Sequence, residues 1–300
     1  MELPAKQWSI GIYQGKNPFH FLPAAKINNP VLTRQDVSDV PAAFVADPFM
    51  IKAGDTWYMF FEVMNRHSCK GEIGLARSVD GIHWKYEKIV LIKPFHLSYP
   101  YVFEFQNKYY LMPECGRTKS IHLYRATRFP EEWRLDSILL QGAVYTDSSL
   151  FCYHDRWWIF TDTLENENQD TLRLYHADAL HGPWSEHPQS PIIRNGRPMA
   201  RPGGRVVIVD GQIVRYAQDN IPSYGTRIHA LVITELTPTI YREEAWDHNV
   251  VLDASGAGWN GSGMHHIDPH QLEDGSFIAC VDGRSAASDA DISTGIGTDA

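Results

Sequence analysis

Short apolar and aromatic runs, separated by polar turns, follow one another along most of the chain, and this pattern is typical of β-strands. The runs recur in pairs, at residues 47–62, 99–114, 147–162, 201–219 and 265–282. A short polar turn such as Ala53-Gly54-Asp55 joins the members of each pair, which indicates a β-hairpin. No long segment shows the period of an amphipathic helix. The chain is therefore predicted to be all-β and built from five copies of one unit.

A third and a fourth strand follow the pair in four of the copies. The fourth strand carries an aromatic residue, and these residues stand 49, 51 and 57 positions apart: Trp84, Trp133, Trp184 and Tyr241. Four strands in about 50 residues is the size of a propeller blade. We therefore predict a five-bladed β-propeller. A β-sandwich is the alternative fold, but it would not explain a repeat of this length.

The two ends of the chain complete the predicted ring. The fifth copy lacks its outer two strands, whereas residues 8–13 and 19–32 form two spare ones. Joining these N-terminal strands to the last blade would remove the exposed sheet edges. We predict one propeller domain over residues 1–284. Residues 285–300 are rich in Ser, Ala, Asp and Gly without apolar periodicity, so a flexible tail is expected there.

Composition excludes several classes of function. A formal charge of −9 argues against a general nucleic-acid binder. Neither a signal peptide nor a membrane span is predicted. The four cysteines form no CxxC pair, so reduced thiols in a cytoplasmic protein are expected. The aromatic content of 12% suits strands and also surfaces that stack on sugar rings.

An acidic residue closes the second strand of every copy: Glu62, Glu114, Asp162, Asp219 and Asp282. In the first three copies, Asp47, Tyr99 and Asp147 stand 15 positions before it. The two positions meet at one end of an antiparallel hairpin, and first strands line the channel of a propeller. These residues, with Arg201 and residues 265–268, should therefore surround one mouth of the channel. Each acid could instead cap a loop or pair with a basic residue.

Carboxylates that converge on an aromatic-lined cavity suit glycoside chemistry. One carboxyl protonates the leaving oxygen, while a second activates water or attacks the sugar. Arg201 and Arg205 would either neutralise the acids or recognise a carboxylate or phosphate on the ligand. Binding roles are predicted for the other residues around the mouth: His96, Tyr99, Tyr101, Arg201, Arg205, Asp219, His266 and Asp268. No cofactor or metal ligand is assigned, and a structural cation in the channel remains an option.

The motif Ala46-Asp47-Pro48-Phe49 and the position of Asp147 at the head of the third copy resemble the five-bladed propeller glycosidases of the arabinanase, xylosidase and invertase type. This resemblance implies that Asp47 is the base or nucleophile and that Asp147 adjusts the pKa of the general acid. The acid of the arabinanase branch is a Glu beyond the third blade, where this chain has Arg201-Pro-Gly-Gly-Arg205. Glu114 or Glu62 would have to replace it.

Longer motifs resemble the N-terminal domain of plant glucosamine inositolphosphorylceramide transferases and their bacterial relatives. They span residues 40–245 and include Phe44-Val-Ala-Asp-Pro-Phe49, His96-Leu-Ser-Tyr-Pro-Tyr-Val-Phe-Glu104, Ala200-Arg-Pro-Gly-Gly-Arg205, Gln218-Asp219 and Tyr224-Gly225. In the plant proteins this domain precedes a separate glycosyltransferase domain. The resemblance implies the propeller fold and a carbohydrate context.

The leading hypothesis is a carbohydrate-active enzyme, of glycoside hydrolase or glycosyl-transferring type, that acts on an oligosaccharide or glycoconjugate. His96, Tyr99 and Tyr101 would shape its sugar pocket. The second hypothesis is a non-catalytic glycan-binding propeller that serves a glycosyltransferase partner. The third is a propeller that binds another protein.

Overall fold

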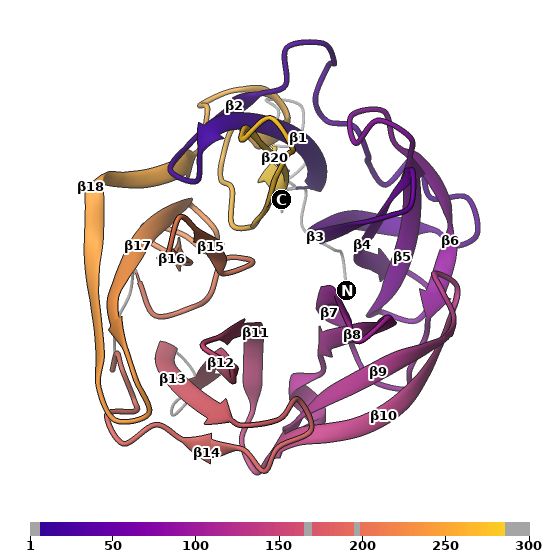
Figure 1. Cartoon of the computed structure of the whole chain (residues 1–300). Helices are drawn as coiled ribbons and strands as arrows, with labels where there is room; N and C mark the ends of the chain where they lie inside the picture. Colours follow the sequence, from indigo (N-terminus) through magenta and orange to yellow (C-terminus); the bar gives the residue numbers. More distant parts are fainter. Residues whose placement is uncertain (1–6, 165–169, 195–198, 286–300) are drawn as a thin grey trace, which may run out of the picture.

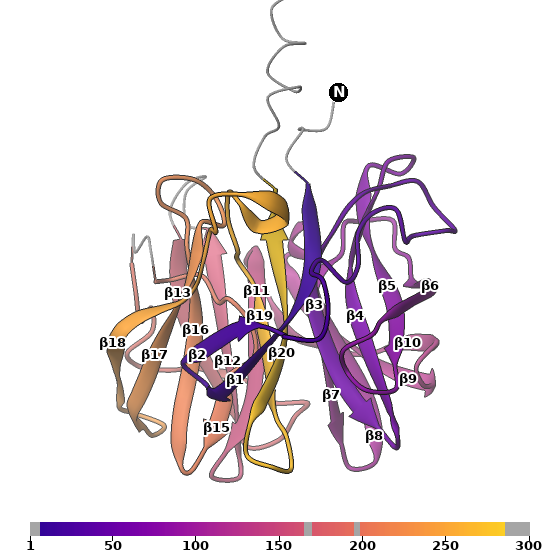
Figure 2. The same cartoon turned by 90° about the horizontal axis from the view of Figure 1, so that it is seen from above.

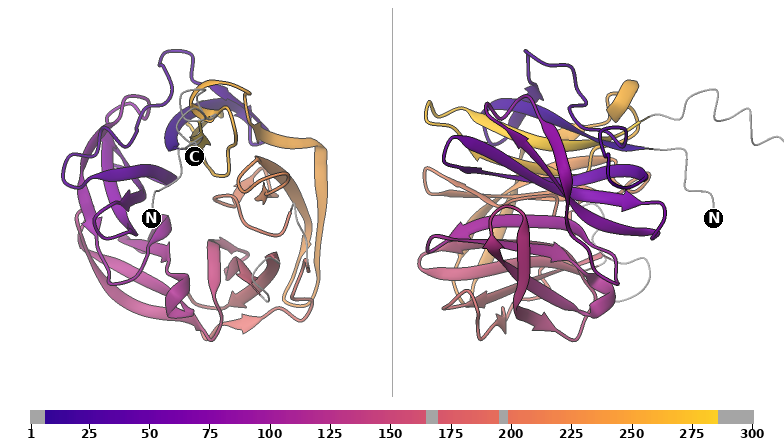
Figure 3. Two further views of the ribbon diagram at one scale, coloured as in Figure 1. Left: turned by 180° about the vertical axis from the view of Figure 1, so that it is seen from behind. Right: turned by 90° about the vertical axis from the view of Figure 1, so that its right-hand side faces the viewer.

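The structure is a computed structural model, and it describes residues 7–164, 170–194 and 199–285. Within these residues, twenty strands form five antiparallel sheets of four strands each. The sheets stand as blades around a central axis (Figure 1). The same ring is visible from behind, in the left-hand view of Figure 3, and the right-hand view shows the propeller from its side. The protein is therefore an all-β, five-bladed propeller, as the repeat predicted.

Each blade runs from an innermost to an outermost strand. Blade 1 comprises β3 (Ala42–Ala53), β4 (Thr56–Asn65), β5 (Lys70–Ser78) and β6 (Lys85–Leu91). Blade 2 comprises β7 (Ser98–Phe105), β8 (Lys108–Glu114), β9 (Ser120–Arg128) and β10 (Glu132–Gln141). Blade 3 comprises β11 (Tyr145–Tyr153), β12 (Arg156–Leu164), β13 (Asp170–Ala177) and β14 (Ser185–Glu186). Blade 4 comprises β15 (Val207–Val209), β16 (Gln212–Asp219), β17 (Arg227–Leu236) and β18 (Tyr241–Asp253).

Blade 5 closes the ring with strands from both ends of the chain. It comprises β19 (Ile267–Gln271), β20 (Phe277–Arg284), β1 (Trp8–Asn17) and β2 (His20–Pro23). Strand β1 pairs with β20 from Trp8↔Arg284 to Gly15↔Phe277, which confirms the predicted closure. The second N-terminal strand is shorter than predicted, because the chain leaves the sheet at Pro23. Residues 286–300, for which a flexible tail is expected, lie outside the described residues.

Apolar side chains fill the space between neighbouring blades, which explains why the inner strands are apolar on both faces. Phe60 of blade 1, for example, packs edge-on against Trp133 of blade 2, with 5.5 Å between ring centroids. Burial of such a ring stabilises the fold by on the order of 25 cal/mol for each Å² of apolar surface that is removed from water. Two short 3₁₀ turns, Gly116–Thr118 and Gly258–Asn260, are the helical elements among the described residues. No helix there is long and apolar enough to cross a membrane.

Three innermost strands contain the same bulge at the same position. Asp47, Tyr99 and Asp147 have positive φ angles of 52°, 45° and 46°, and the strand register slips beside each of them. A left-handed backbone is uncommon for residues other than glycine and costs on the order of 1–3 kcal/mol. Its recurrence in three blades marks one end of the ring as specialised. Strand β1 begins at this end and β20 ends there, so both described chain ends lie beside it (Figure 2).

A candidate carboxylate site at the propeller mouth

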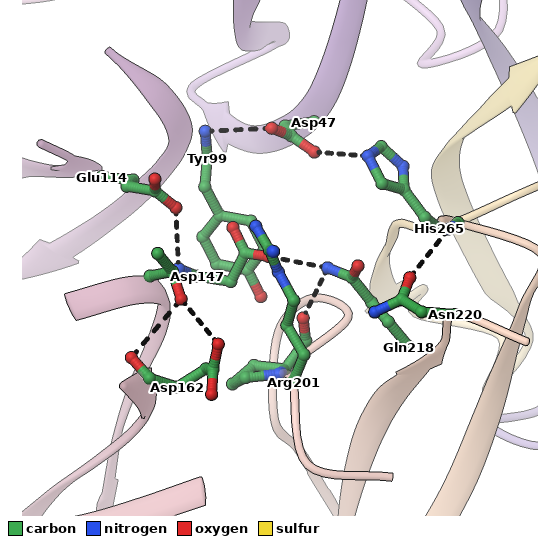
Figure 4. A network of polar contacts seen from close by, with 12 residues as sticks. Asp47, Tyr99, Glu114, Asp147, Asp162, Arg201, Gln218, Asn220 and His265 are labelled. Atoms are coloured by element: carbon green, nitrogen blue, oxygen red, sulfur yellow. Dashed lines mark hydrogen bonds and ion pairs between the residues drawn. The ribbon is translucent and has the colours of Figure 1, made fainter. Parts of the chain in front are cut away.

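At one mouth of the propeller, the bulged residues Asp47, Tyr99 and Asp147 lie close to acids of the second strands, of which Figure 4 labels Glu114 and Asp162. The strand register explains this proximity, because Glu62, Glu114 and Asp162 lie opposite the residues that immediately precede the three bulges. We refer to Asp47, Glu62, Glu114, Asp147 and Asp282 as the carboxylate cluster. Four of these five side chains are buried and Glu114 is half-buried. Buried carboxylates need a partner or a task.

On one side of the cluster, a histidine lies between two carboxylates. His265 Nδ1 is 2.7 Å from Asp282 Oδ2, and His265 Nε2 is 3.6 Å from Asp47 Oδ1. Burial disfavours the charged imidazole, but Asp282 and Asp47 outweigh it and raise the pKa of His265. Burial raises the pKa of Asp47 to about 7 although His265 lowers it. Burial also acts to raise the pKa of Asp282, but protonated His265 outweighs it and the pKa of Asp282 is lowered. The trio therefore combines an ionised carboxylate, an imidazolium and a carboxyl that titrates near neutral pH.

On the other side of the cluster, an arginine holds Asp147 ionised. Arg201 Nε donates to Asp147 Oδ2 at 2.5 Å, and Gln218 Nε2 donates to the same oxygen at 2.7 Å. Burial alone would raise the pKa of Asp147, but Arg201 outweighs it and the pKa is lowered. Arg201, for which a binding role was predicted, thus contacts a residue of the predicted catalytic set.

Two acids of the cluster tie neighbouring blades together. Glu114 of blade 2 accepts the backbone N–H of Asp147 in blade 3 at 3.0 Å. Asp282 of blade 5 accepts the N–H of Asp47 in blade 1 at 3.1 Å. Each bond satisfies a donor that its bulge removes from the strand ladder. Part of the acidic repeat is therefore structural.

Glu62 departs from this pattern. The corresponding N–H, that of Tyr99, donates to Asp47 Oδ2 at 3.3 Å instead. Glu62 is only 5% exposed, and its Oε1 has no hydrogen-bond partner among the described residues. Burial first, and then Asp47 and the other acids, raise the pKa of Glu62 well above its ordinary value. A protonated carboxyl without a structural bond is what a general acid requires.

His96 is the neighbour of Glu62 and faces solvent. Its Nε2 lies 3.3 Å from Glu62 Oε1, without the alignment of a hydrogen bond. The Gly71 N–H donates to His96 Nδ1 at 2.9 Å, so a neutral ring carries its proton on Nε2, toward Glu62. Burial, and then Arg117, lower the pKa of His96, which favours this neutral ring.

Several residues with predicted binding roles lie further along the axis and contact one another. Arg205 of blade 4 donates from Nε to Asp268 Oδ1 of blade 5 at 2.6 Å, and its guanidinium carbon is 4.6 Å from the ring centroid of Tyr101 in blade 2. Arg205 and His270 overcome burial and lower the pKa of Asp268 to about 2. These side chains brace three blades across the axis. His266 is fully buried against Phe49, and burial lowers its pKa to about 4.

Two other residues with predicted binding roles also have hydrogen-bond partners within the protein. Tyr99 is fully buried, and its hydroxyl lies 3.0 Å from Ser149 Oγ. Asp219 accepts the N–H of Ile221 at 2.9 Å, in the loop that follows β16. Successive strand residues point to opposite faces, so it is Gln218 that reaches the cluster. Sequence reasoning placed Asp219 there because it aligned the acids of the five copies.

The part of the chain described by the structure contains one group of residues that could hold a metal ion. Ligand atoms of Asp47, His265 and Asp282 all lie within 4.8 Å of one another. Asp282 and Asp47 outweigh burial and raise the pKa of His265, so a protonated imidazole between the two carboxylates also accounts for the arrangement. The geometry fits either a protonated His265 or a bound cation, so the structural cation considered from the sequence stays a prediction.

The fold and the site define a five-bladed propeller with a buried carboxylate cluster at one mouth. The chain belongs to the family described as glucosamine inositolphosphorylceramide transferase 1, N-terminal, whose model matches residues 4–284. The rice protein of that name (Oryza sativa subsp. japonica) is 38% identical over 296 residues, covering 92% of this chain and 40% of the rice protein. The chain thus spans less than half the length of this relative, and its family is linked to a carbohydrate-active protein.

Solved structures with the same fold come from enzymes that act on carbohydrates. β-1,2-Mannobiose phosphorylase from Listeria innocua has a TM-score of 0.63 and 12% identity, covering 90% of this chain and 96% of its own. The catalytic domain of a family 62 α-L-arabinofuranosidase from Coprinopsis cinerea has a TM-score of 0.61 and 12% identity, covering 94% and 98%. At such identity the likeness shows the fold alone. Together with the family match, it confirms both resemblances that the motifs indicated.

Proposed function

We propose that the protein hydrolyses or transfers a glycosyl group of an oligosaccharide or glycoconjugate at the carboxylate cluster. Glu62 is the general acid and Asp47 is the general base. Asp147, held ionised by Arg201, stabilises positive charge that develops on the sugar. The observation that carries the proposal is the difference in partners within one cluster: Glu62 is buried and its Oε1 has no hydrogen-bond partner among the described residues, whereas Asp147 pairs with Arg201 and Asp282 with His265. Burial accordingly raises the pKa of Glu62, and the paired cations outweigh burial and lower the pKa of Asp147 and of Asp282. Such a difference in pKa separates acid from base in enzymes of this kind.

In the proposed reaction, Glu62 gives its proton to the glycosidic oxygen as the bond from that oxygen to the anomeric carbon breaks. Asp47 takes a proton from the nucleophile, which is water in hydrolysis or an acceptor hydroxyl in transfer, as the new C–O bond forms. A base is most effective when its pKa lies near the working pH, and the pKa of Asp47 is about 7. The relatives' name, a glucosamine inositolphosphorylceramide transferase, supports glycosyl transfer to a glycoconjugate as one form of this activity.

The test is a screen of aryl glycosides and oligosaccharides against the wild type, Glu62→Gln and Asp47→Asn. We expect each substitution to lower kcat by about 10²–10⁴-fold, the usual contribution of a general acid or base. Glu235→Gln is the matched control, because Glu235 pairs with Arg242 at 3.2 Å on the outer strands of blade 4. Turnover that survives both cluster substitutions would remove these residues from the mechanism.

A second function is a glycan-binding propeller that serves a glycosyltransferase partner. One observation favours it: Arg201 pairs directly with Asp147 and so occupies a carboxylate of the predicted catalytic set. In that case, glycans bind to the wild type without product release. Asp47→Asn and Glu62→Gln would then change the affinity for the glycan, and no turnover would be detected with the wild type or with either variant.

A further inference from the structure

Tyr224 is an exposed aromatic residue at the edge of the carboxylate cluster. It belongs to the loop of residues 220–226 that joins β16 to β17, and it is 43% exposed. Its aromatic neighbours at the mouth, Trp8 and His265, are buried and stack on each other with 3.9 Å between ring centroids. Neither the fold nor the proposed chemistry accounts for an exposed ring in this place.

The loop is built to hold its backbone in one conformation. The Asp219 side chain accepts the Ile221 N–H at 2.9 Å, and the Asn220 side chain accepts the Gly225 N–H at 2.7 Å. Thr226 Oγ1 donates to the Ser223 carbonyl at 2.7 Å. Three side chains thus fasten a loop of seven residues. Asp219, for which a binding role was predicted, helps to position this loop.

A close contact of Gly225 with Trp8 and His265 fixes the position of the loop next to the site. Gly225 has φ +67°, and a Cβ added there would lie 2.7 Å from the Trp8 ring and 3.0 Å from His265 Cβ. The backbone next to Tyr224 therefore rests directly on the stacked pair. A rigid loop that presents an exposed ring is prepared for a ligand, since little side-chain or loop entropy remains to be lost on binding.

The ring of Tyr224 is connected to both halves of the cluster. The guanidinium carbon of Arg201, which holds Asp147, lies 5.4 Å from the Tyr224 ring centroid. The ring of His265, which faces Asp47, meets Tyr224 edge-on at 5.2 Å. A group stacked on Tyr224 is thereby kept next to Arg201 and His265, the partners of Asp147 and Asp47.

Two unsatisfied acceptors of the site indicate what such a group carries. Glu62 Oε1 and Gln218 Oε1 are buried without a hydrogen-bond partner among the described residues. A ligand that satisfies them presents hydroxyl or amine donors, and one that stacks on Tyr224 presents an apolar face. A sugar ring has both, because its C–H groups form a face and its hydroxyls point outward. Aromatic side chains with a polar tip suit such mixed ligands.

We propose that Tyr224 is the platform on which a sugar ring stacks at the mouth, with the loop of residues 220–226 as its support. The proposal rests on the proposed function, since it places the sugar whose bond Glu62 and Asp47 act on. It adds a binding residue that none of the catalytic arguments requires. It also commits to a carbohydrate rather than a protein partner, because the ring contacts Arg201 and His265, the partners of Asp147 and Asp47, and two buried acceptors of the site have no hydrogen-bond partner among the described residues.

The experiment tests a panel of methyl glycosides of the common hexoses, pentoses and hexosamines. Saturation-transfer NMR shows which sugar protons contact the protein, and a titration gives the affinity of each glycoside. The proteins compared are wild type, Tyr224→Ala and Tyr224→Phe. Tyr58→Ala is the matched control, because Arg77 lies over the Tyr58 ring at 5.5 Å, at the beginning of β4 and thus away from the mouth. Thermal unfolding of each variant confirms that it is folded.

For a glycoside that binds the wild type, we expect Tyr224→Ala to weaken binding about tenfold, and Tyr224→Phe by no more than about threefold, because the stacking face is retained. Saturation in the wild type should be strongest on the protons of one sugar face. Wild-type affinity in Tyr224→Ala, or an equal loss in Tyr58→Ala, overturns the platform but leaves the proposed function standing. Failure of every glycoside to bind the wild type overturns both.

Discussion

Replacing Asp47 with Asn removes a buried carboxyl whose pKa burial raises to about 7, so the substitution should change how stability depends on pH. An unfolded chain ionises an aspartate near pH 4. Between these two values the folded protein holds a proton that unfolding releases. The contribution of Asp47 to stability is therefore fully present below the unfolded pKa and is lost as pH rises through the folded pKa.

The magnitude follows from the shift. The folded and unfolded pKa values differ by about three units, and each unit corresponds to about 1.4 kcal/mol, so stability should fall by about 4 kcal/mol between pH 4 and pH 7 because of Asp47. Asp47→Asn cannot show this fall. The free energy of unfolding of the wild type, relative to that of the variant, should thus decline steadily across this range.

Two measurements check this. Urea denaturation of both proteins from about pH 4 to pH 7 gives the difference in the free energy of unfolding. A pH indicator then counts the protons released on unfolding at about pH 5.5, where the wild type should release about one proton more than Asp47→Asn. Asp178→Asn, which removes a surface carboxyl that is 83% exposed, is the control. A difference that stays constant with pH, with equal proton release, would refute the reasoning.

Other substitutions test the remaining contacts of the mouth. Arg201→Ala leaves Asp147 buried without its cation, and it should destabilise the protein by about 3–5 kcal/mol in denaturant titrations; Arg201→Lys, which keeps the charge, should cost less. Gly204→Ala would place a Cβ 1.7 Å from the Ile267 carbonyl oxygen, so it should lower Tm well below that of Gly211→Ala, where φ is also positive but no atom lies within 4 Å. Equal Tm values for the two alanine variants would show that blades 4 and 5 do not meet so closely.

The repeat in the sequence was enough to predict the fold and the general position of the cluster. The offset of 15 residues placed Asp47, Tyr99 and Asp147 beside the acids of their own blades, and the register of three blades agrees. The closure by β1 followed from counting strands, because an incomplete blade at one end needs spare strands from the other. These conclusions depend on spacing within one blade, which a sequence displays directly.

The pairing between blades could not be predicted in the same way. Arg201 meets Asp147 across 54 positions and His265 meets Asp47 across 218, and no local pattern connects such pairs. The fourth copy was also misjudged by one residue, because a slip of one position turns a side chain to the other face of a strand. Gln218 rather than Asp219 therefore reaches the cluster. An alignment of the five copies on their acids conceals this difference between Gln218 and Asp219. The alternation of side chains between the two faces of a strand reveals it.

The acidic repeat has a structural cause, and that cause helps to separate structure from function. A bulge that turns its residue toward the axis frees a backbone N–H, and the acid of the preceding blade accepts it, as Glu114 and Asp282 do. These two acids therefore have a structural role whatever the protein does. Glu62 fills the same place in the repeat without the bond, because Asp47 takes the N–H of Tyr99. The buried acid that the fold does not use is the one whose presence chemistry must explain, and this makes Glu62 the most informative residue to substitute first.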